Sequence, residues 1–221
     1  MKLTERHLRN IIRESLSEIL REAADDTFSL QELSNLPSFN AKVKYCKQHL
    51  GSQIGNGSAR IVFQIDDEKC LKLAKNQKGI AQNGVENDWY KQKMDCFPKI
   101  FEVDQDNQWI VTEYVLPAKP NDFKQCLGIT MDEFFKFMTT CYKRYARGFL
   151  PRAAYDWNTF YEMIDNNKDL NTFNRYMCDY QPPIGDMLRI SSYGLALRHN
   201  QPAIVILDHG LSYEVYNTYY R

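Results

Sequence analysis

Three residues suited to binding an anion stand close together in the stretch from Ser52 to Lys75. Gly55 and Gly57 bracket a tight turn, where main-chain N–H groups can approach a phosphate because neither residue carries a Cβ. Lys72 follows on an apolar strand, so that its aliphatic stem can be buried while its ammonium group faces the space beneath the turn. The spacing predicts a phosphate site, although a surface hairpin with one exposed lysine is the simpler interpretation of this stretch alone.

Two carboxylates farther along the chain would complete such a site. Glu86 lies on the apolar side of a predicted helix, and a core-facing glutamate needs a cationic partner, for which Lys72 is the natural candidate. Asp208 ends the apolar stretch AIVIL, where its carboxylate can bind a hydrated Mg²⁺ together with phosphates. Each also has a simpler interpretation, because a lone helical glutamate is usually solvated and Asp-His-Gly favours a turn.

The elements that would position these residues follow from alternation and helical spacing. Residues 52–55, 59–65 and 70–75 form a meander of strands, a helix follows, and two more strands complete a five-stranded antiparallel sheet. Beyond a proline-rich connector the chain becomes helical and closes with a hairpin, and the segment 181–187 is expected to be a loop. The fold class is therefore α+β. The remaining predicted elements are a helix over 78–93, strands over 98–104 and 108–115, helices over 131–147, 157–165 and 169–180, and the hairpin over 193–208.

The N-terminal residues 3–23 carry the strongest helical pattern of the chain. Leu and Ile recur on one stripe while Arg and Glu cover the other face, which predicts an amphipathic helix with a mixed-charge surface. A polar break follows, so this helix either packs on its own domain or is an arm that binds a partner protein or a second copy. The predicted divisions are the arm (1–24), a small region with two short helices and the sheet (25–116), and a helical region ending in the hairpin (117–221).

Composition excludes several classes of partner. The 28 Lys and Arg balance the 28 Asp and Glu, which gives no electrostatic basis for binding nucleic acid or an acidic membrane surface. The six cysteines include no C-x-x-C pair and are expected to be reduced core thiols of a cytoplasmic protein. The four histidines form no zinc-ligand spacing with them, and neither a membrane span nor a signal peptide is found in the sequence.

The order of these elements resembles the two-lobed protein kinase-like fold, in which a five-stranded small lobe with one helix precedes a helical lobe. The resemblance implies that Gly55 and Gly57 cover the phosphates of ATP and that Lys72 contacts them. It also implies that Glu86 pairs with Lys72 and that Asp208, in Asp-His-Gly, binds Mg²⁺. A nucleotide and Mg²⁺ are therefore the expected cofactors.

The resemblance covers roughly residues 50 to 212. It implies a hinge at Glu113–Leu116, where the main chain of Glu113 and Val115 would bind the adenine edge. The segments GNGSARIVF, LKLAKNQKG and ILDHGLS look most like the compact kinase-like proteins encoded by bacteriophages and their hosts. That likeness implies a location in the cytoplasm of a bacterial host or in association with a virion.

The sequence departs from the family pattern at several positions. Arg60 stands at the third glycine of G-x-G-x-x-G, and the His-Arg-Asp catalytic loop is absent, which leaves Asp186 as the candidate base. The family places an asparagine five residues after that aspartate, where this chain has Ser191. Counting back through the hairpin instead places Tyr193 or Gly194 there, so the second metal ligand is missing in either alignment. The short stretch after the hairpin leaves no room for an activation segment or for the later helices that bind protein substrates.

Two functions from different classes follow from this pattern. The missing asparagine and the truncated helical lobe favour a pseudokinase-type binding module, associated with a phage or host assembly. The retained lysine, glutamate and aspartate keep open the alternative, an active Mg-ATP-dependent phosphotransferase with Asp186 as base.

Overall fold

A computed structural model describes residues 27–146 and 154–220 of the chain. The chain divides into two units, Met1–Ser52 and Gln53–Arg221. The helix predicted over residues 3–23 lies outside the described residues, as does the predicted end of the helix over 131–147.

The first unit contains two short helices, as the sequence predicts. They are α2 (Leu30–Asn35) and α3 (Phe39–Leu50). Ser29 and Ser38 cap their first turns by accepting hydrogen bonds from main-chain N–H groups. α3 stops at Gly51, whose φ of 84° is a conformation that glycine adopts without strain.

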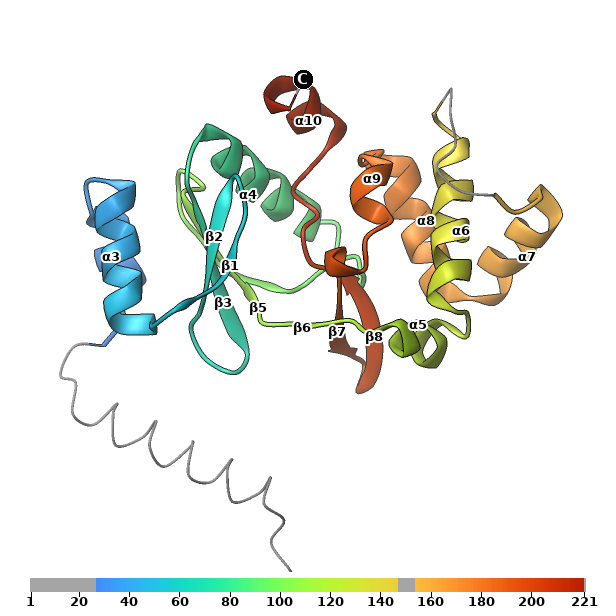
Figure 1. Ribbon diagram of the computed structural model, residues 1–221, viewed down its shortest axis with the longest axis horizontal. Coiled ribbons are helices and arrows are strands. Elements are labelled where there is room, and N and C mark those ends of the chain that lie inside the picture. The colour runs from blue at the N-terminus through green and yellow to red at the C-terminus, as the bar shows by residue number, and fades with distance from the viewer. Residues whose placement is uncertain (1–26, 147–153, 221) are drawn as a thin grey trace, which may run out of the picture. The chain divides into compact units, whose positions relative to one another are not determined.

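The second unit begins with a five-stranded antiparallel sheet in the order β1-β2-β3-β5-β4 (Figure 1). Its strands are β1 (Gln53–Asn56), β2 (Arg60–Gln64), β3 (Lys69–Ala74), β4 (Ile100–Val103) and β5 (Trp109–Glu113). Lys72 lies on the central strand and pairs with Val62 of β2 and Ile110 of β5. The predicted five-stranded antiparallel sheet is confirmed, and the mixed α+β class with it.

One helix, α4 (Gln77–Tyr90), is inserted after the third strand. Asn76 caps it, and Gly79 brings its first turn so close to the sheet that a Cβ there would lie 2.3 Å from the Ala59 carbonyl oxygen. The most buried stripe of α4 is polar: Gln82, Asn83 and Glu86 recur at helical spacing and are at most 4 % exposed. This inward polar stripe places hydrogen-bonding groups on the inner side of the sheet.

A second, three-stranded antiparallel sheet follows the first one in the same unit. It consists of β6 (Leu116–Pro117), β7 (Tyr193–Arg198) and β8 (Gln201–Ile206), with β7 in the middle. The predicted closing hairpin is therefore confirmed. Its two-residue turn, His199–Asn200, has positive φ at both residues, as a tight hairpin turn requires.

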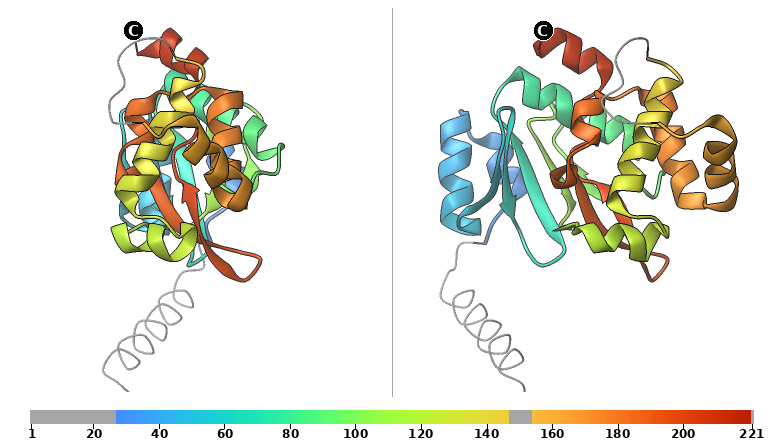
Figure 2. Two further views of the ribbon diagram at one scale, coloured as in Figure 1. Left: turned by 90° about the vertical axis from the view of Figure 1, so that its right-hand side faces the viewer. Right: turned by 45° about the vertical axis from the view of Figure 1, so that its right-hand side comes forward.

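Helices surround this hairpin (Figures 1 and 2). α5 (Pro120–Leu127) packs on β8, and α6 (Met131–Lys143) packs on α8 (Lys168–Tyr180) and α9 (Ile184–Met187). The core beneath them is largely aromatic, with Phe123, Phe134, Phe173 and Tyr193 in mutual ring contact. The helices are α5 (Pro120–Leu127), α6 (Met131–Lys143), α7 (Trp157–Asn166), α8 (Lys168–Tyr180), α9 (Ile184–Met187) and α10 (Tyr213–Tyr219), with a 3₁₀ turn at Ile190–Ser192.

Four of the α-helices and strands in this unit were not predicted. α5 begins with a proline at its first position, where no N–H is needed, and the sequence pattern there favours a connector. The expected loop over 181–187 contains α9, a single turn that starts after two prolines. β6 and α10 are too short to show a periodicity of their own. None of the helices in the described ranges is long and apolar enough to cross a membrane.

Candidate functional site

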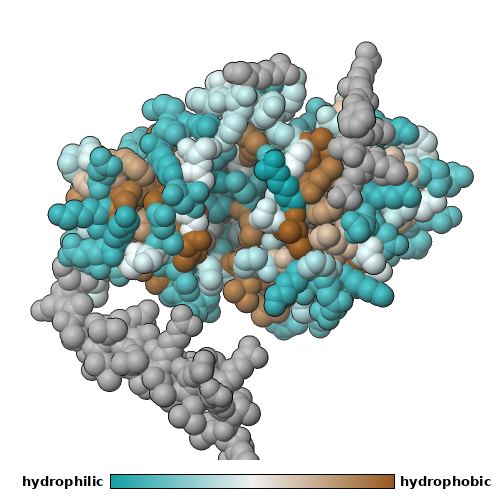
Figure 3. Space-filling view, viewed as in Figure 1, coloured by the Kyte–Doolittle hydropathy of each residue, from teal (hydrophilic) through white to brown (hydrophobic). Residues whose placement is uncertain are grey.

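A cavity of about 470 Å³ opens in the second unit between the first sheet and the start of the segment after β8. That volume is within the range of small-molecule sites. On the face drawn in Figure 3, apolar side chains lie near the middle, among polar ones. Six residues predicted from the sequence line the cavity: Gly55, Gly57, Lys72, Glu113, Val115 and Asp208.

Lys72 forms the predicted ion pair with Glu86 beneath the cavity. Its Nζ lies 2.7 Å from Glu86 Oε2 and donates a second hydrogen bond of 2.8 Å to the Leu207 carbonyl oxygen. Glu86 is completely buried. Burial alone would raise the pKa of this carboxyl group, but the charges of Arg60 and Lys72 outweigh burial and lower the pKa well below its usual range. Glu86 is therefore an anion enclosed by two cations.

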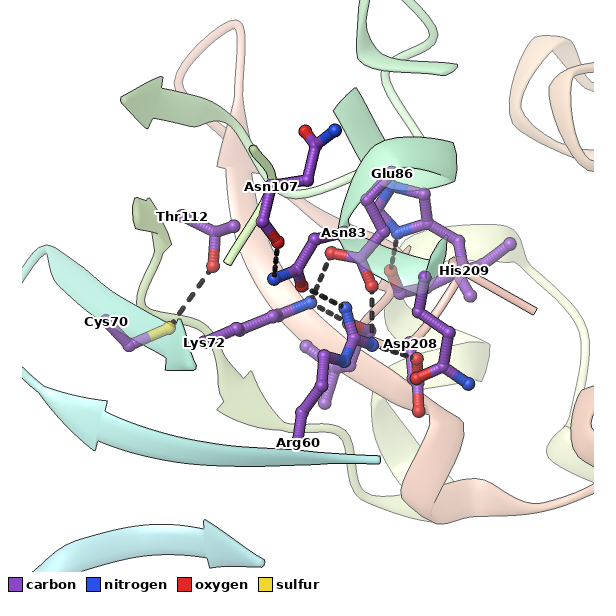
Figure 4. Close-up of polar contacts among 12 residues, drawn as sticks. Arg60, Cys70, Lys72, Asn83, Glu86, Asn107, Thr112, Asp208 and His209 are labelled. Atoms are coloured by element: carbon purple, nitrogen blue, oxygen red, sulfur yellow. Dashed lines mark hydrogen bonds and ion pairs between the residues drawn. The ribbon is translucent and has the colours of Figure 1, made fainter. Parts of the chain in front are cut away.

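The second of these cations, Arg60, is a site residue that the sequence analysis did not assign to the site. Its guanidinium is buried and lies 2.7 Å from Glu86 Oε1, and its Nη1 donates a 3.1 Å hydrogen bond to Asn83 Oδ1 (Figure 4). Its Nη2 also contacts Oδ1 of Asp208. Strand alternation could have revealed it, because Arg60 is two residues before Val62, the cross-strand partner of Lys72, and so shares that face.

Asp208 follows β8 and reaches the cavity from the hairpin side, as predicted. Its carboxylate is 62 % exposed and is ion-paired with Arg60. The glycine of Asp-His-Gly has a packing role, because a Cβ on Gly210 would lie 2.5 Å from the main-chain oxygen of Gln82 on α4. The motif therefore places the chain directly against α4, which a simple turn after a strand would not require.

His209 points away from the cavity into the aromatic core. Its ring stacks on Phe97 with centroids 4.2 Å apart, and its Nδ1 lies 3.3 Å from the Ile206 carbonyl oxygen. Because a carbonyl can only accept, Nδ1 carries the proton, and the buried Nε2 has no partner within the described part of the chain. Burial lowers the pKa of His209 to about 4, so the ring is neutral near pH 7.

The glycine turn supplies fewer N–H groups than the sequence implied. The Gly57 N–H donates to the Arg60 carbonyl oxygen at 2.9 Å and closes the hairpin. The N–H groups of Ser58 and Ala59, in contrast, have no hydrogen-bond partner in residues 27–146 or 154–220. The donors available to an anion therefore lie just beyond the two glycines.

The predicted hinge lies at the opposite end of the cavity. The Glu113 carboxylate pairs with Arg198 at 2.7 Å, while Val115 packs against the hairpin and lines the cavity. Leu116 pairs with Leu195 of β7, which links the end of the first sheet to the second. Because Arg198 occupies the Glu113 carboxylate, the main chain of this segment is the part left to bind a ligand.

The structure does not bring Asp186 to the cavity lining. It lies on α9, is partly buried and pairs with Arg189 at 3.5 Å. Burial raises the pKa of its carboxyl group, and the nearby Asp208 charge adds to this effect. Of the residues considered for the asparagine position, Ser191 lines the cavity, whereas Tyr193 is buried in the core.

Among the described residues, no group of three or more His, Cys, Asp or Glu side chains could hold a metal ion. The chain matches no protein-family model, and no curated protein is significantly similar to it. The chemistry of the site therefore rests on its own residues: two buried cations, an enclosed carboxylate and an exposed one at the edge of a cavity.

Proposed function

We propose that this protein is a nucleotide-binding module with a kinase-like, two-lobed arrangement and little or no phosphotransfer activity. The observation that carries the proposal is the position of Lys72. Its ammonium group is fixed by Glu86 and by the Leu207 carbonyl at the edge of a cavity that opens beneath the turn of the first hairpin. A lysine fixed in this way contributes a cation at a defined position, as a phosphate-binding lysine must.

The two ends of the cavity differ in chemistry and match the two parts of a nucleotide. Val115, at the hinge end, provides apolar surface on which an aromatic base can lie, and Ile54 and Val62 extend this surface toward Lys72. At the other end, Lys72 and Arg60 provide positive charge, with the unpaired N–H groups of Ser58 and Ala59 nearby. A ligand with a flat base and an anionic tail, such as ATP, fits this division.

The position of Asp186 supports the non-catalytic form of the proposal. A base must lie within hydrogen-bond reach of the acceptor hydroxyl, directly or through one water molecule. Asp186 pairs with Arg189 and does not line the cavity in which the phosphates would lie. The alternative, an active Mg-ATP-dependent phosphotransferase, is favoured by one observation: the raised pKa of Asp186 would make it a stronger proton acceptor.

We also propose that the N-terminal segment binds a partner protein or a second copy of the chain. The support is the amphipathic pattern of residues 3–23, with its mixed-charge face. An assembly of phage or host proteins would be such a partner.

Thermal unfolding with nucleotide tests the proposed function. With ATP at about a hundredfold excess over its Kd, the melting temperature should rise by about 5–10 °C, because a ligand that binds only the folded state stabilises it by about 3 kcal/mol. Lys72→Met keeps the buried stem and removes the charge, so it should abolish the rise. Lys91→Met, which removes an exposed lysine paired with Asp88, is the matched control and should retain it.

The choice of ligands makes the test specific. Inorganic triphosphate should give a smaller rise than ATP if the apolar end holds the base. Absence of any rise or calorimetric heat with wild-type protein would refute nucleotide binding. Steady phosphotransfer that Asp186→Asn abolishes would instead establish the phosphotransferase.

A further inference from the structure

Arg60 is the cation that contacts Asp208 in this structure. Its guanidinium bridges two carboxylates from different elements, Glu86 on α4 and Asp208 after β8 (Figure 4). Asn83 holds the other side of the guanidinium through Nη1. A planar group held from three sides has a defined position, and its charge is permanent because arginine does not deprotonate in proteins.

The charges around Asp208 leave little attraction for Mg²⁺. The kinase-like resemblance implies Mg²⁺ at this carboxylate, and an Mg²⁺ ion is held by one or two carboxylates together with phosphates. Here Lys72 and Arg60 already neutralise Glu86 and Asp208 charge for charge. A divalent ion at Asp208 would stand beside the Arg60 guanidinium, whose charge already balances this carboxylate and would repel a second cation next to it. The residues present therefore do not fit the metal.

We propose that Arg60 takes the place of the divalent cation, so that the phosphates of a nucleotide bind here without Mg²⁺. This inference rests on the proposed function, because it concerns the same cavity. Arg60 and Lys72 both line it, so their remaining donors can meet phosphate oxygens from the cavity side. An arginine at the third glycine of the turn is then a functional substitution: it removes a small residue and adds the counter-charge that the metal would have supplied.

Calorimetry with ATP in excess MgCl₂ and in excess EDTA tests the inference on wild-type protein. We expect the two Kd values to agree within about twofold. A Kd that weakens about tenfold or more in EDTA would overturn the inference while leaving nucleotide binding intact. If ATP binds under neither condition, the proposed function fails, and this inference fails with it.

Two variants separate the roles of Arg60 and Asp208. Arg60→Gln should weaken binding in EDTA by about tenfold or more, since it removes a charged phosphate donor. Arg144→Gln removes an exposed arginine that bonds Asn174 elsewhere in the same unit, and it should leave both Kd values unchanged. Asp208→Asn should tighten ATP binding, because Arg60 loses a competing anion. If Asp208 instead holds a metal, this variant weakens Mg-dependent binding, which would contradict the inference.

A direct metal measurement does not depend on any variant folding well. Mn²⁺ is titrated into wild-type protein, first without ATP and then with ATP, and the electron spin resonance signal of unbound Mn²⁺ is recorded. The control is the same titration of ATP in buffer without protein. We expect the protein to bind no Mn²⁺ beyond what free ATP binds. Stoichiometric uptake of Mn²⁺ that Asp208→Asn removes would overturn the inference.

Discussion

The imidazole of His209 stacks face to face on the ring of Phe97, with centroids 4.2 Å apart and planes 13° from parallel. Trp89 lies against the same imidazole on α4, so a titratable ring occupies an aromatic core. Protein kinases, which the sequence resembles, have phenylalanine at the middle position of the Asp-x-Gly motif. Histidine supports the same stacking but leaves a buried ring nitrogen without a partner.

The burial of His209 in its neutral form predicts that the protein loses stability in mild acid. The folded-state pKa of about 4 is below the ordinary value of 6.5, so the unfolded chain binds a proton before the folded protein does. The contribution of neutral His209 to the free energy of unfolding is complete above pH 6.5. It falls as the pH drops toward 4, by about 2 kcal/mol between pH 7 and pH 5. Urea unfolding at these two pH values measures the difference.

His209→Phe should remove this pH dependence and raise stability near pH 7 by about 1–2 kcal/mol, because the ring stacking remains and the unpaired nitrogen is lost. His199→Asn alters an exposed histidine in the hairpin turn and should leave the pH dependence intact. An unchanged acid profile in His209→Phe would contradict a buried, neutral His209.

Glu86→Gln should be among the most destabilising single substitutions in this protein. It keeps the shape of the side chain but leaves Arg60 and Lys72 buried without their shared counter-ion, which costs about 3–5 kcal/mol. Glu102→Gln, at an exposed position on β4, should change the unfolding free energy by less than about 0.5 kcal/mol. Denaturant unfolding of the two variants side by side gives the comparison. Similar values for both would mean that the enclosed ion pairs contribute nothing to stability.

Gly210→Ala should destabilise the protein by about 1–3 kcal/mol through overpacking, since its Cβ would meet the Gln82 carbonyl oxygen on α4. Gly185→Ala is the matched control, because a Cβ there meets no atom within 4 Å and the residue lies in a helical turn. The control should be neutral or slightly stabilising. Equal melting temperatures for the two variants would show that the segment after β8 can move away from α4 without cost.

Deletion of residues 1–24 should leave the melting temperature nearly unchanged and abolish association, if this segment is the docking arm that its sequence predicts. Light scattering coupled to gel filtration follows the assembly, and calorimetry follows unfolding. A loss of several kcal/mol of stability, as expected when several core leucines and isoleucines are removed, would place the segment in the core of the domain instead.

The sequence predicted the first sheet and the closing hairpin because their strands alternate clearly. It also predicted α4, although the buried stripe of that helix is mostly polar and Ile80 and Val85 are only half-buried. The pairing of Lys72 with Glu86 could be anticipated because a carboxylate on an inward helical face requires a cation. The role of Arg60 is hidden in the sequence because the residue aligns with a glycine of G-x-G-x-x-G; strand alternation is the signal that places it beside Lys72. α9 and α10 are short, and their formation depends on tertiary contacts that no local pattern records.

The hydrogen bond from Lys72 to the Leu207 carbonyl, together with the contact between Arg60 and Asp208, joins the first sheet to the chain that leaves the hairpin. The same two side chains line the cavity, so a phosphate that binds their remaining donors would change the charge balance of the contacts that tie these two parts together. Ligand occupancy would then set the rigidity of this joint. The hydrogen-exchange rates of the main-chain N–H groups of residues 207–210, measured with and without nucleotide, would show whether these contacts become less or more stable on binding.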